Sequence, residues 1–490
     1  MTTATAAPFA SPLTLPTITP ELFAPPTNKP PAELAITRVL ARLEAERRDL
    51  GRDVISFGGG LPSPRTFDVR NYERHARAYF KHIAQRAQQG DIAAPTDPYK
   101  VWQSVLNYTD TRAQWWIRND FAEAHSRDMG FRIDPNRLVP TQGNTQGIHA
   151  LLQYYNQLGV PVAIFCERQA YTGMLTAAKQ MPNLKIFSVD MDEDGMKPEH
   201  LIARQREAMA KGFIPGMIYL VPDGGNPSGI TISQQRRDDL YRQNLELARE
   251  TGKIAYFFED SPYYLIRVGS ANTAYPKPMA ANDPAGVVIY AFSASKIGYP
   301  GKRVGWLHLP MAWCSTDAEG HNLTLHAEAT AQIAATVLLH SSEALAEFNG
   351  QMFAPRTGAF VGLWPRSKVN SAIYRANMQM LYGGLATALA QPHPELFKLS
   401  LMPSNGFVIT LAFPGLASRT RFTNTSELAT HLLEDSDVIV TPMAGFAPDD
   451  IPPGSLDEIV RFTFSATPPE RIDEGVERFV RGVKLAYNLP

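Results

Sequence analysis

Short apolar runs alternate with amphipathic stretches between residues 135 and 310. One amphipathic stretch lies between the apolar runs at 216–222 and 254–260. It repeats apolar residues at helical spacing, namely Leu240, Tyr241, Leu245 and Ala248, and Gly252 marks a helix end. Strands that alternate with helices predict a mostly parallel α/β sheet, with ligands bound beyond the carboxyl ends of the strands. The predicted strands are VAIFC (162–166), KIFSVDM (185–191), GMIYLVP (216–222), IAYFFED (254–260), VVIYAFS (287–293) and RVGWLHL (303–309).

A second set of elements follows a long helical stretch at about 325–350. At the start of its last helix, Thr467, Pro468 and Glu470 predict a capping box. This set predicts a smaller α+β unit at the C-terminal side. Its elements are a helix near 367–391, strands at FVITLAF (407–413), VIVTP (438–442) and EIVRFTF (458–464), and a last helix with the buried stripe Ile472, Val476, Phe479, Val480 and Val483.

Composition narrows the class of protein. The 490 residues are 44% hydrophobic and 19% charged, with a formal net charge of -1, so nothing favours a nucleic-acid or membrane-surface partner. The first charged residue is Glu21 and there is no long apolar run, which predicts neither a signal peptide nor a membrane span. Cys166 and Cys314 stand in no metal-ligand spacing, so no metal is expected. We expect a cytoplasmic enzyme.

The segment SASKIGYPGKRVGW (293–306) carries the sharpest chemical signal. Lys296 follows an apolar strand and stands among small hydroxyl residues. Its amine can form an imine with an aldehyde cofactor, while the hydroxyls and Arg303 bind a phosphate. The alternative is a surface turn with an ordinary solvated lysine.

Three residues upstream support the cofactor interpretation. Asp260 ends a strand in EDSPYY, where a carboxylate beside a pyridine nitrogen would keep that nitrogen protonated. Tyr263 in the same motif and Asn226 in PDGGNPSG could both donate to an oxygen atom on the same pyridine ring of the cofactor. The alternatives are a helix cap for Asp260, core packing for Tyr263 and a plain Asn-Pro turn.

Two further motifs complete the pattern. TQGNTQGIHALL offers a glycine turn that opens a helix, whose free N–H groups would receive a phosphate dianion. Tyr171, in ERQAYTG after another strand, is placed to stack on a cofactor ring, with core packing as the alternative.

In this order, G-N-T, an aromatic after the next strand, NPSG, DxPY, SxSK and PGxRxGW resemble the class I/II aminotransferases of pyridoxal 5′-phosphate (PLP) fold type I, and most of all their aromatic and α-aminoadipate aminotransferase branch. ISFGGGLPSP (55–64) and VRFTFS (460–465) are similar to the same family. The resemblance spans roughly residues 50–485. It implies a large domain with a mostly parallel mixed sheet in an α/β/α sandwich, and a smaller α+β C-terminal domain.

The resemblance also implies roles for individual residues. Lys296 would hold PLP as a Schiff base and move the substrate proton, Asp260 would pair with the pyridine nitrogen, and Tyr263 and Asn226 would bind the ring oxygen. Arg461, with Asn226 and the backbone of Gly60, would bind the substrate carboxylate. The implied protein is a homodimer in which Tyr108 reaches the partner's cofactor phosphate. The residues that match the phosphate cup are Asn144, Thr145, Ser293, Ser295 and Arg303.

Three departures from the family pattern concern the substrate entrance. TDTRAQWWIRNDF follows Tyr108 where a glycine and a leucine-arginine pair are usual, Lys302 replaces an apolar residue, and VTPMAGFAP lacks the usual Pro-Gly pair. The leading hypothesis is an aminotransferase that moves an amino group from an L-amino acid, aromatic or long-chain, to a 2-oxo acid. The alternative is a lyase, synthase or oxidase of the same fold that eliminates or replaces a β or γ group, for instance on S-adenosylmethionine.

A non-enzymatic regulator with this fold would need a DNA-binding domain, and the first 50 residues are too short and proline-rich for one. The expected division of the chain is a flexible arm at 1–30 and a segment at 31–105 that contributes to the small domain and the active-site edge. The large PLP-binding domain is expected at 106–350 and the small domain at 351–490. A polar loop or insertion is expected at about 84–100.

Overall fold

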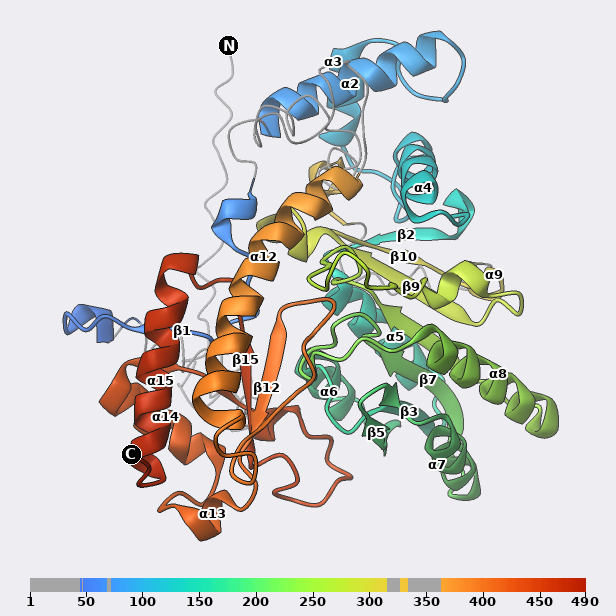
Figure 1. The fold of residues 1–490 in the computed structure, drawn as a ribbon. Helices are drawn as coiled ribbons and strands as arrows, with labels where there is room; N and C mark the ends of the chain where they lie inside the picture. Colours follow the sequence, from blue (N-terminus) through green and yellow to red (C-terminus); the bar gives the residue numbers. More distant parts are fainter. Residues whose placement is uncertain (1–44, 46, 68–71, 315–326, 334–362) are drawn as a thin grey trace, which may run out of the picture.

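The computed structural model describes residues 45, 47–67, 72–314, 327–333 and 363–490 (Figure 1). The predicted arm at 1–30 and most of the predicted helix at 325–350 lie outside these residues. The described part divides into a large α/β layer structure and a smaller unit in which the long helices α12 and α15 lie side by side (Figure 1).

A seven-stranded sheet with the order β2-β10-β9-β8-β7-β3-β4 forms the centre of the large unit. Its strands pair in parallel except for β10, which is antiparallel to both neighbours. The predicted fold class is therefore confirmed, and each predicted strand forms within about two residues. The strands are β2 Leu138–Thr141, β3 Val162–Glu167, β4 Leu184–Val189, β7 Ile214–Leu220, β8 Tyr256–Asp260, β9 Val288–Ser293 and β10 Gly305–His308.

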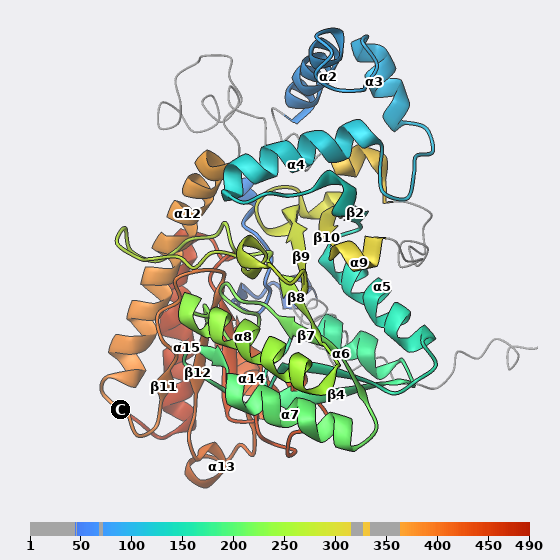
Figure 2. The ribbon, with the colours of Figure 1, turned by 90° about the vertical axis from the view of Figure 1, so that its right-hand side faces the viewer.

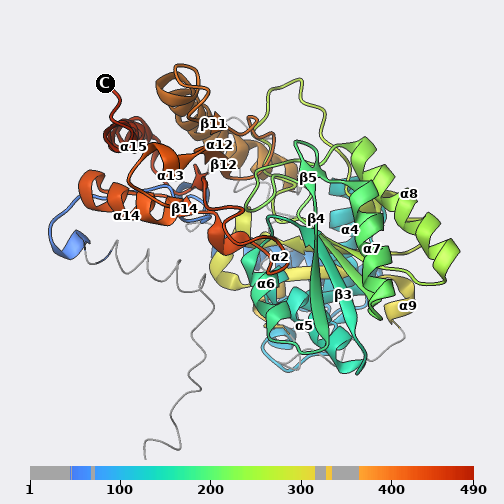
Figure 3. The same ribbon diagram turned by 90° about the horizontal axis from the view of Figure 1, so that it is seen from below.

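Helices cover both faces of this sheet, which explains why its strands read as continuous apolar runs. In the view from below, α5 and α6 lie on one side of β3 and β4, and α7 and α8 lie on the other (Figure 3). The α8 helix ends as predicted, with Gly252 in the left-handed conformation at φ 69°. The bounds are α5 Asn144–Gln157, α6 Thr172–Lys179, α7 Pro198–Ala210 and α8 Gln234–Thr251; a short β5–β6 pair (Met191–Asp192, Gly195–Met196) precedes α7.

The polar loop predicted at about 84–100 forms over the shorter stretch 89–97, and helices α2 and α3 cover the two ends of the predicted range. Helix α2 runs over Tyr72–Gln88 and α3 over Pro98–Val105, with Asp97 capping α3. Gln85, Gln88, Gln89 and Asp91 are exposed on α2 and in the turn after it. Arg86 instead pairs with Asp120 and Glu123 of the helix after α3, and Tyr79, Phe80 and Ile83 are buried. Helix α4 (Trp115–Met129) follows and packs beside the sheet edge (Figure 2).

The smaller unit has an antiparallel sheet of order β11-β12-β15-β14. The predicted strand at 438–442 is interrupted, because β13 pairs with β1 and β14 pairs with β15. Its elements are α12 Leu363–Leu385 with a π-turn at Ala386–Ala390, β11 Lys398–Leu399, β12 Val408–Ala412, α13 Leu416–Arg419, α14 Thr425–Ser436, β13 Val438–Ile439, β14 Thr441–Pro442, β15 Ile459–Thr463 and α15 Ile472–Ala486; β1 is Ile55–Ser56.

The capping box predicted for the last helix does not form. The Thr467 hydroxyl donates to the carbonyl oxygen of Ser56 at 2.8 Å, and α15 begins only after a 3₁₀ turn at Pro469–Arg471. The buried stripe that was predicted for this helix is confirmed at all five positions, Ile472, Val476, Phe479, Val480 and Val483. The helix thus docks through its apolar face, while Thr467 fixes the segment around β1.

Candidate active site

Lys296 lies in the 3₁₀ turn Ala294–Lys296 that directly follows β9. Its Nζ donates to the carbonyl oxygen of Gly60 at 2.7 Å and lies 5.9 Å from the ring centroid of Tyr263. Burial, together with repulsion from Arg461 and Arg303, lowers the Lys296 pKa to about 8, although Asp260 acts in the opposite direction. A lower pKa leaves more of the amine neutral near pH 7, and the neutral amine is the form that attacks a carbonyl carbon.

Asp260 is the last residue of β8 and is 5% exposed. Its two carboxylate oxygens accept hydrogen bonds from Asn144 Nδ2 at 2.6 Å and from the Tyr219 hydroxyl at 2.8 Å. Burial raises the Asp260 pKa to about 6, and these two hydrogen bonds and Lys296 oppose that rise. The carboxyl group is therefore mostly ionised at neutral pH and can pair with a cationic ring nitrogen.

The sequence reasoning missed Tyr219, which is buried near the end of β7, the strand beside β8. A signal was present, since a phenol inside an apolar strand needs a partner for its hydroxyl. The partner is the carboxylate at the end of the next strand.

The side chain of Asn144 contacts Asp260 and the carbonyl oxygen of Ala291, at 2.6 and 3.2 Å, and so points to the sheet. Only its main-chain N–H, at the start of α5, is left for the predicted phosphate contact. Thr145 is exposed one residue later, and its hydroxyl lies 3.1 Å from the Tyr171 hydroxyl.

The remaining residues of the predicted phosphate cup form one corner. The Ser293 hydroxyl donates to Ser295 Oγ at 2.9 Å, and an Arg303 guanidinium nitrogen donates to the same Ser295 Oγ at 3.3 Å. Gly143, which precedes α5, has φ 81°, and a Cβ there would lie 2.6 Å from the Arg303 guanidinium. A helix N-terminus, two hydroxyls and a guanidinium that reaches over a bare glycine fit a phosphate dianion.

Arg461 projects from β15 and is 7% exposed. Its guanidinium donates to Asn226 Oδ1 at 2.7 Å, to the Gly58 carbonyl oxygen at 2.8 Å and to Thr441 Oγ1 at 3.4 Å. The glycine segment at 58–60 therefore contacts both Lys296 and Arg461. A buried guanidinium on this segment can bind a carboxylate that is held near the lysine amine.

Three tyrosines were predicted to contribute. Tyr263 is 4% exposed, and burial, with Asp260 and Tyr171 nearby, raises the pKa of its phenol. Tyr171 is half-buried immediately before α6. Tyr108 lies on the loop after α3 and is 83% exposed in this single chain. The structure thus brings Tyr171 and Tyr263 close to Asp260 and leaves Tyr108 on the surface.

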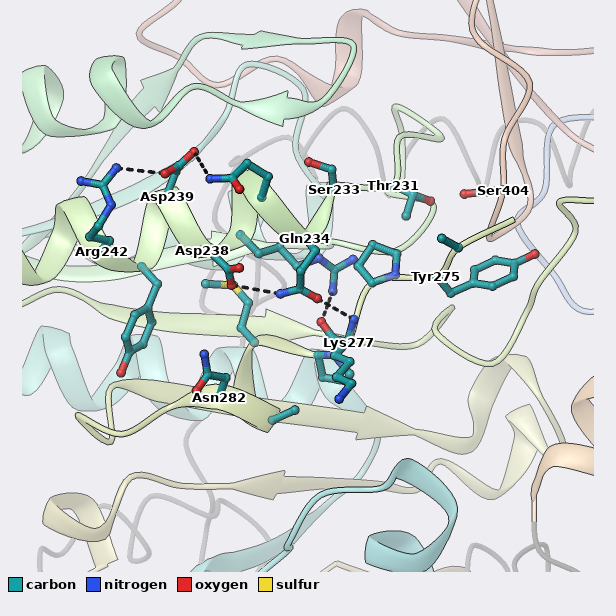
Figure 4. Close-up of a pocket in the computed structure, with 18 residues that line it drawn as sticks. Thr231, Ser233, Gln234, Asp238, Asp239, Arg242, Tyr275, Lys277, Asn282 and Ser404 are labelled. Carbon is teal, nitrogen blue, oxygen red and sulfur yellow. Dashed lines mark hydrogen bonds and ion pairs between the residues drawn. The ribbon is translucent and has the colours of Figure 1, made fainter. Parts of the chain in front are cut away.

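A groove of 1190 Å³ opens elsewhere, between α8 and the loop around residues 274–282 (Figure 4). Its polar groups pair among themselves, as in the contacts of Asp239 with Arg242, at 2.9 Å, and of Gln234 with Asp238, at 3.0 Å. None of the predicted site residues lines this groove. The groove is therefore separate from the cluster of residues around Lys296.

The comparisons with known proteins identify the family of this chain. The family described as aminotransferase class I and II matches residues 71–479. The chain belongs to this family. Members of the family depend on PLP, which makes PLP the cofactor of this chain, and the residues around Lys296 fit it.

Similar proteins include Aromatic-amino-acid aminotransferase 1 of Thermococcus litoralis, 28% identical over 52% of this chain. The chain spans about half the length of the curated relatives it matches: 54% of the Thermococcus litoralis protein and 57% of an aromatic amino acid aminotransferase of Schizosaccharomyces pombe. It is 25% identical to the (S)-3,5-dihydroxyphenylglycine transaminase of Amycolatopsis orientalis over 89% of both chains. Among solved structures, the multiple substrate aminotransferase from Thermococcus profundus has a TM-score of 0.73 at 21% identity, covering 96% of this chain and 100% of that one.

Among the described residues, no helix is long and apolar enough to cross a membrane. In the same part of the chain, no group of three or more His, Cys, Asp and Glu residues could hold a metal ion.

Proposed function

We propose that this protein is an aminotransferase that moves an amino group from an L-amino acid to a 2-oxo acid. The observation that carries the proposal is the convergence of a lysine amine and a buried arginine on the segment 58–60, with a buried carboxylate close to the lysine. Transamination needs an amine that binds the cofactor, a cation that binds the substrate carboxylate and a carboxylate that pairs with the cofactor ring nitrogen. The candidates for these three functions are Lys296, Arg461 and Asp260, in that order.

PLP, when bound, supplies an electron sink for the bond that breaks at the substrate α-carbon. Asn144 and Tyr219 orient the Asp260 carboxylate, which would pair with the cofactor ring nitrogen and keep it protonated. Lys296 Nζ would take the α-proton of the substrate and return a proton on the cofactor side. Its lowered pKa, about 8, suits both directions of transfer, because the neutral and the protonated amine are both accessible near neutral pH.

The remaining residues bind and orient. Arg461 would receive the substrate α-carboxylate through its guanidinium N–H groups, and Asn226 keeps that guanidinium in place through its 2.7 Å contact. Tyr263 and Asn226 would donate to the ring oxygen of the cofactor. Tyr171 would stack on the ring. The phosphate would be held by the hydroxyls of Thr145, Ser293 and Ser295, the main chain of Asn144 and the guanidinium of Arg303.

We propose an aromatic or long-chain donor, and the aromatic class is favoured because the similar proteins include one named for aromatic amino acids and one named for dihydroxyphenylglycine. The enzyme acts in the cytoplasm as a homodimer. In the dimer Tyr108, 83% exposed in one chain, reaches the phosphate of the partner's cofactor. Two free thiols, one of them fully buried at Cys166, support a reducing compartment.

Elimination or replacement at a β or γ carbon is the alternative that the altered entrance motifs suggest. The named relatives are aminotransferases, which does not favour it.

The test of the function is a panel of L-amino acids and S-adenosylmethionine, offered to the PLP-loaded protein with 2-oxoglutarate as acceptor. We expect glutamate to form in step with the 2-oxo acid of one donor class, measured by chromatography. Release of ammonia or of a β or γ leaving group without any glutamate would replace this proposal by the alternative.

For Arg461→Ala we expect KM for the amino donor to rise by roughly 10–100-fold, because a charged hydrogen-bond partner of the carboxylate is lost. Steady-state kinetics with the donor and with the corresponding amine that lacks a carboxylate measure the effect. Arg421→Ala removes a surface arginine as the matched control. An equal loss for donor and amine would assign Arg461 a structural part only.

A further inference from the structure

Phe446 lies directly beneath the guanidinium of Arg461. The guanidinium carbon is 4.8 Å from the centroid of the Phe446 ring, which is the geometry of a cation–π contact. Phe446 is 3% exposed and packs in a small apolar cluster with Met443, Ile451 and Leu456. The ring thus forms a fixed floor under a guanidinium whose other contacts, to Asn226, Gly58 and Thr441, come from oxygen atoms around its edge.

The main chain of Phe446 connects two parts of the site. Its carbonyl oxygen accepts a hydrogen bond at 3.1 Å from the N–H of Ala170, the residue before Tyr171. At the other end of the same turn, Met443 N donates to Ile459 O at 3.0 Å, on the strand that carries Arg461. The turn 443–446 therefore spans from the arginine strand to the start of α6.

Ion pairs fasten the continuation of this turn to the large unit. Lys179, at the end of α6, lies 2.6 Å from Asp449, and the Asp450 carboxylate accepts a 2.8 Å hydrogen bond from the main chain of Ser188 and pairs with Arg204. The segment 443–450 is held at both ends and along its length. The segment therefore links the main chain just before Tyr171 to the strand that carries Arg461.

We propose that Phe446 is a positioning residue for recognition of the substrate α-carboxylate: its ring holds the Arg461 guanidinium in the plane that the carboxylate meets. This inference rests on the proposed function. It assigns a part to the segment VTPMAGFAP, where the sequence departs from the Pro-Gly pattern of the family. The orientation of the Arg461 guanidinium then depends on the aromatic face of Phe446.

The test compares Phe446→Leu and Phe446→Met, which keep an apolar side chain of similar size, with Phe446→Tyr, which keeps the ring. In the two non-aromatic variants KM for the amino donor rises about tenfold while kcat changes less than about threefold, since only a contact to Arg461 is lost. KM for the amine that lacks a carboxylate stays unchanged. In Phe446→Tyr the KM returns to within about threefold of the unmodified protein.

Phe422→Leu is the matched control, because Phe422 is also buried and also stacks under an arginine, Arg421 at 5.0 Å, but does so away from the site. Its KM stays that of the unmodified protein. Unchanged KM in both non-aromatic variants, or an equal rise for donor and carboxylate-free amine, overturns the inference. Failure of the proposed function is distinct from this result, because then the unmodified protein transfers no amino group at all.

Discussion

Replacing Lys296 by alanine is expected to abolish turnover, with a fall in kcat of roughly 10³–10⁴-fold or more, because the same amine binds the cofactor and moves the substrate proton. The 3₁₀ turn after β9 places this amine against Gly60 O at 2.7 Å, in a site where burial lowers its pKa to about 8. Treatment of the PLP-loaded protein with borohydride, followed by intact mass measurement, is expected to show the mass of the reduced cofactor on the unmodified chain and none on Lys296→Ala.

Lys302→Ala is the matched control, since Lys302 stands in the same β9–β10 connection, six residues further on. The borohydride-fixed mass is expected to remain in this variant. Full turnover of Lys296→Ala in the absence of any added amine, or fixation of the cofactor at Lys302, would remove Lys296 from the centre of the site.

Replacing Asp260 by asparagine is expected to lower kcat by roughly 10²–10³-fold, the loss that follows removal of one preorganised electrostatic partner. The substitution keeps the size of the side chain and removes the charge that Asn144 and Tyr219 orient. In the unmodified protein without cofactor, protonation of Asp260 as pH falls through about 6 removes the same charge. Affinity for PLP, followed by fluorescence, is therefore expected to weaken below about pH 6 and to lose this dependence in Asp260→Asn.

Glu259→Gln serves as the control for a carboxylate at the adjacent position. Successive side chains on a strand point to opposite faces, and Glu259 accepts from Met279 N and Ala280 N at 2.8 and 3.0 Å. Its replacement is expected to leave kcat within about threefold once the protein is shown to be folded by thermal melting. Equal losses in the two variants would mean that Asp260 acts through the fold and not through the cofactor.

The large sheet could be predicted from the sequence because its strands are covered on both faces. Such strands are apolar at nearly every position, so VVIYAFS and GMIYLVP locate β9 and β7 to within about two residues. The helix over 72–88 was missed because it has few apolar residues. Three of them, Tyr79, Phe80 and Ile83, are buried by packing that only the fold supplies.

Side-chain directions in the site could not be predicted where a distant residue decides them. The G-N-T motif indicates a phosphate turn, but the Asn144 amide turns to Asp260, which is 116 residues away along the chain. Thr467 is a suitable cap by its local pattern, yet its hydroxyl contacts Ser56, at a separation of 411 residues. The aromatic floor under Arg461 is a third example, since VTPMAGFAP shows a departure from the family but not where Phe446 points.

Strand β1 has a consequence for how the protein is made on the ribosome. Residues 55 and 56 pair with 438 and 439, and the following residues receive the side chains of Arg461 and Thr463. During synthesis this early segment therefore has no strand partner until nearly four hundred further residues have been translated. Lys296 also emerges before the strand that carries Arg461, so the nascent chain has the cofactor lysine before it has a carboxylate clamp. Substrate recognition is completed only when the late strands return to the first one.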